Sequence, residues 1–278
     1  MPPWLPRSRT RMGDRGMKVN YHTHTVRCQH AMGRDEDYVR AAMDAGFEAL
    51  GFSDHMPWPF GGGFVSGIRM GMADLPGYLA SVKALREQYA GRIRIHLGME
   101  SEYFPRYRDH MLRLRDEGVS YYILGQHYAD SEEDNPYVGI ECMTDEGVLR
   151  YAESTVRAIR TGLFCYVAHP DLFMRHRDDQ EFSRACEQAT DMICQAAGEA
   201  GMPIEYNLLG LQSGLRGHFR GYPSKPFWQY AKKYDNTVIL GTDAHDPALL
   251  ADTSLWETGR ADVTGMGYRL TESLRMEE

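Results

Sequence analysis

Residues 18–24 read KVNYHTH, a strand-like run that ends in two histidines two positions apart, His22 and His24. Side chains at positions i and i+2 of a strand leave it on the same face, so the two imidazoles can bind one ion together. Further along the chain, other apolar runs are also followed by a histidine or a carboxylate. The run at 18–24 is therefore interpreted as the first of a series of strands that carry metal ligands.

Metal-type side chains follow six of the seven strands that the hydrophobic pattern predicts. These strands are expected at about 18–23, 48–53, 92–99, 120–126, 163–168, 203–207 and 237–241. The candidate ligands, with one in the loop after the first strand, are His22, His24, His30, His55, Glu100, His127, His169, Asp243 and His245. Glu102 competes with Glu100 in the same run, and Glu100 is favoured because it comes first after Gly98. Nine ligands are too many for one ion and suit a cluster of two or three.

Helical patterns separate the strands, at about 35–45, 75–89, 107–117, 145–161, 181–200 and 225–234, with a last helical stretch in part of 247–277. Asp35 is expected to cap the first helix, and Gly46 to end it. Strands that alternate with helices indicate an α/β fold with a parallel sheet. Ligands that converge from nearly every strand favour a seven-unit (β/α) barrel, because an open doubly wound sheet gathers its site at one switch point. Two long glycine-rich loops, 56–71 and 208–222, are expected, and the first is predicted to form a lid or a pocket wall.

Composition narrows the classes of function. The 278 residues carry a net charge of −8, which argues against a nucleic-acid partner and against binding to an acidic membrane surface. No apolar run approaches the length of about 18 residues that a membrane span needs. The five cysteines, without a CxxC pair, indicate reduced thiols and a cytoplasmic protein. Cys28 lies between His24 and His30, and a thiolate ligand at that position is left open.

The first sixteen residues place arginines among prolines and glycines and lack the apolar segment of a secretory signal. We expect residues 1–16 to be a disordered extension or not part of the natural chain, with Met17 as the natural start. Residues 17–278 are then expected to form one domain.

Four ordered motifs resemble the polymerase and histidinol phosphatase (PHP) superfamily. They are His22-Thr23-His24-Thr25, Ser53-Asp54-His55, Gly98-Met99-Glu100 and Gly241-Thr242-Asp243-Ala244-His245, supplemented by His127 and His169. The resemblance implies the PHP fold, a distorted seven-stranded (β/α)7 TIM-like barrel that holds three divalent ions. It would assign His22, His24, Glu100 and Asp243 to the first ion, Glu100, His127 and His169 to the second, and His30, His55 and His245 to the third.

Other segments resemble the histidinol-phosphatase branch of that superfamily: Ala168–Phe173, Glu205-Tyr206-Asn207 and Tyr222-Pro223-Ser224. The run Gln126-His127 departs from the Ser-x-His type expected there, which leaves the exact phosphate ester open. The resemblance implies a phosphomonoesterase that converts L-histidinol phosphate and water to L-histidinol and phosphate, in histidine biosynthesis. The nucleophile would be a hydroxide that bridges two ions, with Glu100 as bridging ligand and Asp243 or His245 as proton relay.

The donor set of imidazoles and carboxylates suits zinc, manganese or iron and argues against calcium, which prefers oxygen ligands. The predicted substrate contacts are Arg175, Arg177 and Arg216 for the phosphate and Glu205 and Asn207 for the cationic part. Two alternatives remain: a phosphoesterase that acts on another small phosphate ester or on a nucleotide, and a metal-binding module without catalysis. The expected partner is a small phosphorylated substrate, and the oligomeric state stays open.

Overall fold

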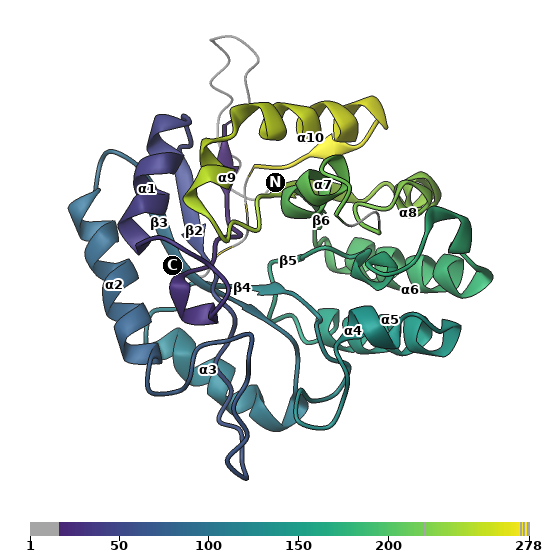
Figure 1. Cartoon of the computed structure of the whole chain (residues 1–278), viewed down its shortest axis with the longest axis horizontal. Coiled ribbons are helices and arrows are strands. Elements are labelled where there is room, and N and C mark those ends of the chain that lie inside the picture. The colour runs from purple at the N-terminus through teal and green to yellow at the C-terminus, as the bar shows by residue number, and fades with distance from the viewer. Residues whose placement is uncertain (1–16, 219–220, 273, 275, 277–278) are drawn as a thin grey trace, which may run out of the picture.

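The computed structural model describes residues 17–218, 221–272, 274 and 276, so the extension predicted at 1–16 lies outside the described residues. Eight short strands form one parallel sheet in chain order: β1 (Val19–Asn20), β2 (Ala49–Phe52), β3 (Arg94–Ser101), β4 (Tyr121–Leu124), β5 (Tyr166–Val167), β6 (Ile204–Asn207), β7 (Thr237–Gly241) and β8 (Arg269–Leu270). The α-helices surround the curled sheet (Figure 1). They are α1 (Asp35–Asp44), α2 (Leu75–Gln88), α3 (Arg108–Asp116), α4 (Val138–Glu141), α5 (Asp145–Ile159), α6 (Arg184–Ala200), α7 (Leu208–Leu215), α8 (Lys225–Ala231), α9 (Pro247–Ala251) and α10 (Thr253–Gly265). Short 3-10 turns are η1 (Val26–Cys28), η2 (Pro105–Tyr107), η3 (Leu172–Met174), η4 (Asp179–Glu181) and η5 (Lys232–Tyr234).

The predicted barrel-like α/β fold and its seven strands are confirmed, but the strand count needs correction, because β8 follows α10 and pairs with the beginning of β7. At the other end of the strands, the chain after β1 pairs with the chain after β7. The N–H of Ala244 donates to the carbonyl of His22 at 3.1 Å, and the N–H of His24 donates to the carbonyl of Ala244 at 2.9 Å. The barrel therefore joins its first and seventh strands at the carboxyl end, whereas the eighth strand lies near the amino end of β7.

Two further element predictions were wrong. Asp35 is the first residue of α1 rather than its cap, and the carboxylate of Asp37 accepts the N–H of Arg34 at 2.9 Å. Gly46 follows the helix with φ 80°, as expected for a helix end. The predicted loop at 208–222 begins with helix α7, which starts where the Asn207 side chain accepts the N–H of Gly210 at 2.8 Å.

Tyr121 crosses the barrel interior from the beginning of β4. Its hydroxyl lies 2.9 Å from the carbonyl oxygen of Tyr21 and 3.1 Å from that of Phe52. Gly51 and Gly98 make this possible, because a Cβ at either position would overlap the Tyr121 ring. The ring thus packs the barrel axis, as side chains do in other (β/α) barrels.

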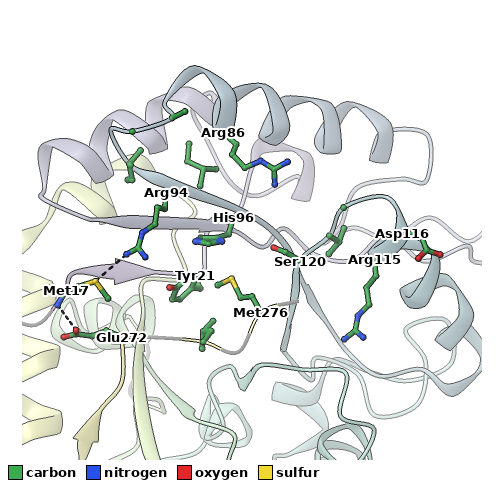
Figure 2. A pocket seen from close by; sticks show the side chains of 17 residues that line it. Met17, Tyr21, Arg86, Arg94, His96, Arg115, Asp116, Ser120, Glu272 and Met276 are labelled. Carbon is green, nitrogen blue, oxygen red and sulfur yellow. Dashed lines mark hydrogen bonds between the residues drawn. The ribbon is translucent and has the colours of Figure 1, made fainter. Parts of the chain in front are cut away.

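A cavity of about 900 Å³ lies at the amino end of the strands (Figure 2). Tyr21, Arg94 and His96 line it, and the backbone N–H of Met17 donates to the carboxylate of Glu272 beside it at 2.6 Å. None of the nine predicted metal ligands reaches this cavity. Throughout the described ranges, no helix is both long enough and apolar enough to cross a membrane.

Candidate metal centre

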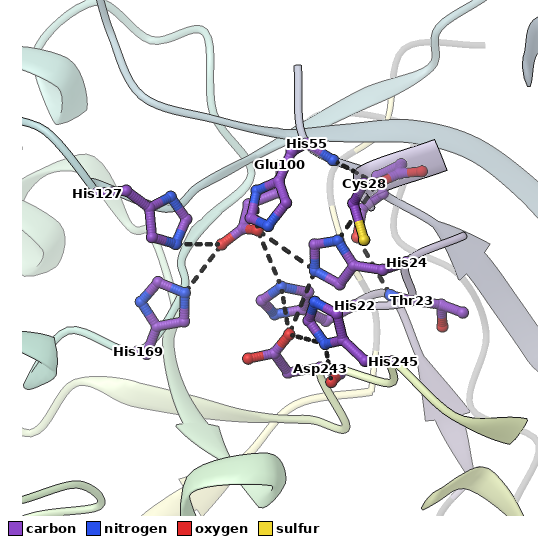
Figure 3. Close-up of polar contacts among 12 residues, drawn as sticks. His22, Thr23, His24, Cys28, His55, Glu100, His127, His169, Asp243 and His245 are labelled. Atoms are coloured by element: carbon purple, nitrogen blue, oxygen red, sulfur yellow. Dashed lines mark hydrogen bonds and ion pairs between the residues drawn. The ribbon is translucent and has the colours of Figure 1, made fainter. Parts of the chain in front are cut away.

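The structure brings all nine predicted ligands together at the carboxyl end of the strands, and Figure 3 labels all of them except His30. In the first group, Nε2 of His22 lies 3.5 Å from Oε2 of Glu100 and 3.4 Å from Oδ1 of Asp243. Nε2 of His24 lies 3.4 and 3.2 Å from the same two oxygens. Four ligands at about 2.1 Å from a tetrahedral ion would stand about 3.4 Å apart. These four atoms therefore have the spacing of one coordination shell.

The second group uses the other oxygen of Glu100. Oε1 lies 2.8 Å from Nε2 of His169 and 3.5 Å from Nε2 of His127. Oε2 also lies 3.0 Å from Nδ1 of His55. Because its two oxygens face different groups of histidines, Glu100 is positioned to bridge two ions.

The third group lies beside the first. One nitrogen each of His24, His55 and His245 lie within 4.8 Å of one another, as do a nitrogen of His30, a nitrogen of His245 and the sulfur of Cys28. The rings of His30 and His245 stack with centroids 4.6 Å apart. Burial alone would raise the pKa of Cys28, but the neighbouring imidazoles of His24, His245 and His30 lower it to about 3.

Several imidazole nitrogens of this centre are buried and have no hydrogen-bond partner among the described residues. They are Nε2 of His22, both nitrogens of His24, Nδ1 of His55, Nδ1 of His169 and Nε2 of His245. Buried polar atoms without partners are rare in proteins and call for an explanation such as an ion. The donor chemistry and these unpaired nitrogens both fit divalent metal ions.

The electrostatics of the centre favour anionic carboxylates. Burial alone would raise the pKa of Glu100, but the imidazoles of His127, His22 and His55 hold it well below its usual value. Burial likewise opposes the charge of Asp243, whose pKa is held well below normal by His22, His24 and His245. Both carboxylates are therefore ready to bind cations.

Two of the candidate ligands have a backbone conformation that residues other than glycine rarely adopt. The φ angle is 29° at His169 and 50° at Asp243. Such strained residues persist only where the surrounding structure holds them, and they concentrate at functional sites. Local strain thus helps aim these two side chains into the centre.

Glu205 and Asn207, predicted to contact substrate, are buried behind the ligands. One oxygen of Glu205 lies 2.8 Å from Nδ1 of His22, and the other accepts the N–H of His169 at 2.9 Å. The Asn207 amide donates to Glu205 at 3.0 Å and to Asp243 at 3.1 Å. Such partners fix the orientation and tautomer of metal ligands, so this geometry indicates support of the ligands rather than substrate contact.

A second support was not found from the sequence. Oε1 of Glu102 lies 3.2 Å from Nδ1 of His127, and Arg69 donates to the same oxygen at 2.8 Å. Arg69 also donates to Glu132 at 2.7 Å and to the carbonyl of Met56 at 2.9 Å, and all three charged side chains are buried. Arg69 belongs to the loop 56–71, and no local pattern marks it as the partner of Glu102, which follows β3.

A cavity of about 580 Å³ opens above the centre. Its lining comprises His30, His55, Gly67, Ile68, Glu100, His127, Tyr128, Tyr137, His169, Leu172, Arg175, Leu209, Tyr222, Asp243 and His245. Gly67 and Ile68 confirm that the loop 56–71 forms a pocket wall. Nη1 of Arg175 lies 3.2 Å from the hydroxyl of Tyr137 and 3.4 Å from that of Tyr222, which hold the guanidinium beside the centre.

The other two predicted arginines lie away from this cavity. The guanidinium of Arg177 donates to the carbonyl of Cys142 at 2.9 Å and to Asp145 at 2.8 Å. Arg216 is exposed at the end of α7. We therefore correct the expectation that these two side chains bind the phosphate: the first is committed to other partners, and neither lines the cavity.

Comparison with known proteins is consistent with this site. The PHP domain family matches residues 20–208, well over half of the chain. A Deinococcus radiodurans protein named "Probable histidinol-phosphatase" is 31% identical over 236 residues, 81% of this chain and 85% of that protein. The Bacillus subtilis histidinol-phosphatase is 24% identical over 254 residues, 82% of this chain and 93% of that protein. The structure of histidinol phosphate phosphatase from Lactococcus lactis, complexed with zinc, L-histidinol and phosphate, has a TM-score of 0.69 at 16% identity. It covers 94% of this chain and 99% of that chain, and the likeness shows a common fold.

Proposed function

Because this chain belongs to the PHP domain family, we propose that it is a metal-dependent phosphomonoesterase whose substrate is L-histidinol phosphate, which it hydrolyses to L-histidinol and phosphate. The observation that carries the proposal is the position of Glu100, whose two oxygens face two groups of imidazoles at the bottom of an open cavity. The names of the two curated relatives support the choice of substrate.

The proposed cofactors are three divalent ions of zinc, manganese or iron. His22, His24, Glu100 and Asp243 would hold the first, Glu100, His127 and His169 the second, and His30, His55 and His245 the third. Bound divalent ions lower the pKa of water and neutralise charge on phosphoryl oxygens. The donor atoms present, imidazole nitrogens and carboxylate oxygens, suit these metals.

The protein's own groups orient the reaction. Glu205 and Glu102 hold the rings of His22 and His127, so that the opposite ring nitrogens face the cluster. Asp243 and His245 stand at the cavity wall, with Nδ1 of His245 3.0 Å from the carbonyl oxygen of Asp243. Either side chain could take a proton from the attacking water and pass it to the leaving alkoxide, and we propose this pair as the proton relay.

Arg175 is the proposed phosphate contact. Its guanidinium is fixed by two tyrosine hydroxyls and lines the cavity together with the ligands, so it can reach anionic oxygens that the ions leave uncovered. Tyr137 and Tyr222 add aromatic faces of the kind that an imidazole can pack against.

The cysteines and the net charge support the proposed cellular location and the proposed partner. No disulfide joins any of the five cysteines, all of which are among the described residues, and this supports the reduced cytoplasmic protein that we propose. The partner is a small phosphorylated molecule, and the net charge of −8 gives no reason to expect a nucleic acid.

The test is phosphate release from histidinol phosphate by protein loaded with zinc, manganese or iron, beside glycerol phosphate, a nucleotide and a phosphodiester. We expect histidinol phosphate to give the highest kcat/KM, and Glu100→Gln and metal-free protein to give almost none. Preference for another ester would contradict the substrate, whereas metal-loaded protein that hydrolyses none of them would favour the non-catalytic alternative.

Arg175→Met should raise KM for histidinol phosphate about tenfold or more, because a hydrogen bond to a charged group contributes about 1.5–3 kcal/mol. The matched control is Arg177→Met, which removes a guanidinium on the same segment that lies off the cavity and should leave KM unchanged. Steady-state kinetics measure both. Equal KM values for Arg175→Met and the unmodified protein would exclude Arg175 as the phosphate contact.

A further inference from the structure

We propose that Cys28 binds the ion next to His30 and His245 as a thiolate, which makes this a mixed sulfur and nitrogen site. The inference rests on the proposed metal centre and adds a ligand to it. On binding, the thiol proton is released to solvent and one sulfur–metal bond forms.

The turn η1 places Cys28 at the centre. The Thr25 side chain accepts the N–H of Arg27, and Gln29 ends the turn with φ 72°. As a result, Cys28 is fully buried between Val26 and Gln29, which are both exposed. The turn thus directs a thiol inward, whereas most of its other residues face solvent.

Two imidazole nitrogens face the same point. Nδ1 of His30 lies 2.7 Å from the carbonyl oxygen of Cys28, which leaves Nε2 free to bind an ion. Nδ1 of His245 lies 3.0 Å from the carbonyl oxygen of Asp243, and its Nε2 is buried without a partner among the described residues. Both rings are therefore held through one nitrogen and available through the other.

The spacing of the three atoms is suitable. The Cys28 sulfur and one nitrogen each of His30 and His245 lie within 4.8 Å of one another. An ion bound to sulfur at about 2.3 Å and to nitrogen at about 2.1 Å would hold these atoms about 3.6 Å apart in tetrahedral geometry. The sulfur and the two nitrogens therefore need to move only slightly toward one another to bind the same ion.

A second observation points to a ligand at the same place. His24 is fully buried, and neither of its ring nitrogens has a hydrogen-bond partner among the described residues. One of these nitrogens lies within 4.8 Å of both the Cys28 sulfur and a carboxylate oxygen of Asp54. Figure 3 shows the sulfur beside the His24 ring. The rings of His24 and His245 stack with centroids 4.0 Å apart, and their unsatisfied nitrogens near the sulfur indicate that an ion belongs in this group.

A thiolate would distinguish this site from the other two. The first two groups offer imidazoles and carboxylates, which accept zinc, manganese or iron, whereas a soft thiolate favours zinc over manganese. We therefore expect zinc to be retained at this site when manganese is in excess.

The experiment uses cobalt and zinc as probes on the full-length protein. Cobalt-loaded protein should show a sulfur-to-cobalt charge-transfer absorption in the near ultraviolet, and X-ray absorption of the zinc form should show sulfur at about 2.3 Å. Cys28→Ser should lose both signals and one bound ion per chain under limiting zinc. The matched control Cys165→Ser changes a half-buried thiol at the far end of the barrel and should keep both signals.

Circular dichroism and thermal unfolding will establish that the Cys28→Ser protein is folded. Absence of a sulfur signal in wild type, or its persistence in Cys28→Ser, would overturn the inference. Hydrolysis of histidinol phosphate without a metal–sulfur bond would contradict this inference alone and leave Cys28 as a neighbour of His24. A metal–sulfur bond without hydrolysis would contradict the proposed function alone.

Discussion

At the scale of single residues, the centre depends on small side chains as well as on ligands. A Cβ at Gly125 would overlap the carboxylate of Glu100, and one at Gly241 would overlap that of Glu205. Glu100 and the carboxylate that supports His22 and His169 therefore each occupy space that a glycine leaves open.

Gly125→Ala should displace the Glu100 carboxylate and lower kcat by about 100-fold, since a shift of about 1 Å in a catalytic group can cost that much. Kinetics and metal content check this. The matched control is Gly77→Ala, in the exposed part of α2, where an added Cβ meets nothing within 4 Å. That change should keep activity and stabilise the protein by about 0.5–1 kcal/mol. Full activity in Gly125→Ala would show that Glu100 can move without loss.

Glu205→Gln should lower metal affinity or activity by about 10–100-fold, because an amide cannot accept hydrogen bonds from His22, His169 and Asn207 through two oxygens. Competition with a chelator measures the affinity. If Glu205 instead bound the substrate, as its place at a strand end suggested, KM would rise and metal affinity would stay unchanged.

Single residues also show the limit of sequence reasoning. The nine candidate ligands were identifiable because all except His30 lie at or just after an apolar run and imidazoles are rare. The role of Glu205 was not identifiable from the sequence, because a carboxylate at a strand end can face either the cavity or the ligands. Only the packing of the folded chain decides which of the two it faces. Arg177 was misplaced for the same reason: nothing local predicts that its guanidinium binds the carbonyl of Cys142.

At the scale of elements, the buried side chain of Arg69 holds the loop 56–71 against the barrel through ion pairs and hydrogen bonds. Arg69 binds Glu102 of the chain after β3 and Glu132 of the loop after β4, and its own carbonyl accepts from Gln29 at 2.8 Å. The pocket wall, the orientation of His127 and the turn that carries Cys28 are thereby connected.

Arg69→Met should lower the free energy of unfolding by about 3–5 kcal/mol, because it leaves two buried carboxylates without their cation. Urea unfolding measures this. The control Arg40→Met removes an exposed partner of Glu36 on α1 and should change stability little. A loss no larger than that of the control would mean that the carboxylates find water or protons instead.

Helices and strands were predictable from the sequence where the hydrophobic pattern was long. The strand at 237–241 and the helix start at 145 were located to the residue, and the end at Gly201 was marked by its glycine. Helix α7 was missed because its sequence contains two glycines, which disfavour helix, and tertiary packing overrides that preference. Strand β8 spans two residues, too few for any periodicity to appear.

At the scale of the whole molecule, ligands from the first strand to the seventh converge on one centre, so metal binding and folding are linked. Removal of metal by a chelator should lower the melting temperature, and zinc or manganese should restore it. At one hundred times its dissociation constant, each independent ion contributes about 2.7 kcal/mol to the folded state. Differential scanning calorimetry checks this, and an unchanged melting temperature would contradict a centre that spans the barrel.

Tyr121 packs against Gly51 and Gly98 and fills the barrel interior below the centre. The ester is therefore expected to enter, and the alcohol and the inorganic phosphate to leave, through the cavity that the candidate ligands line. Phosphate that accumulates will then compete with substrate for the cavity. Turnover in a cell will therefore depend on how quickly phosphate is removed.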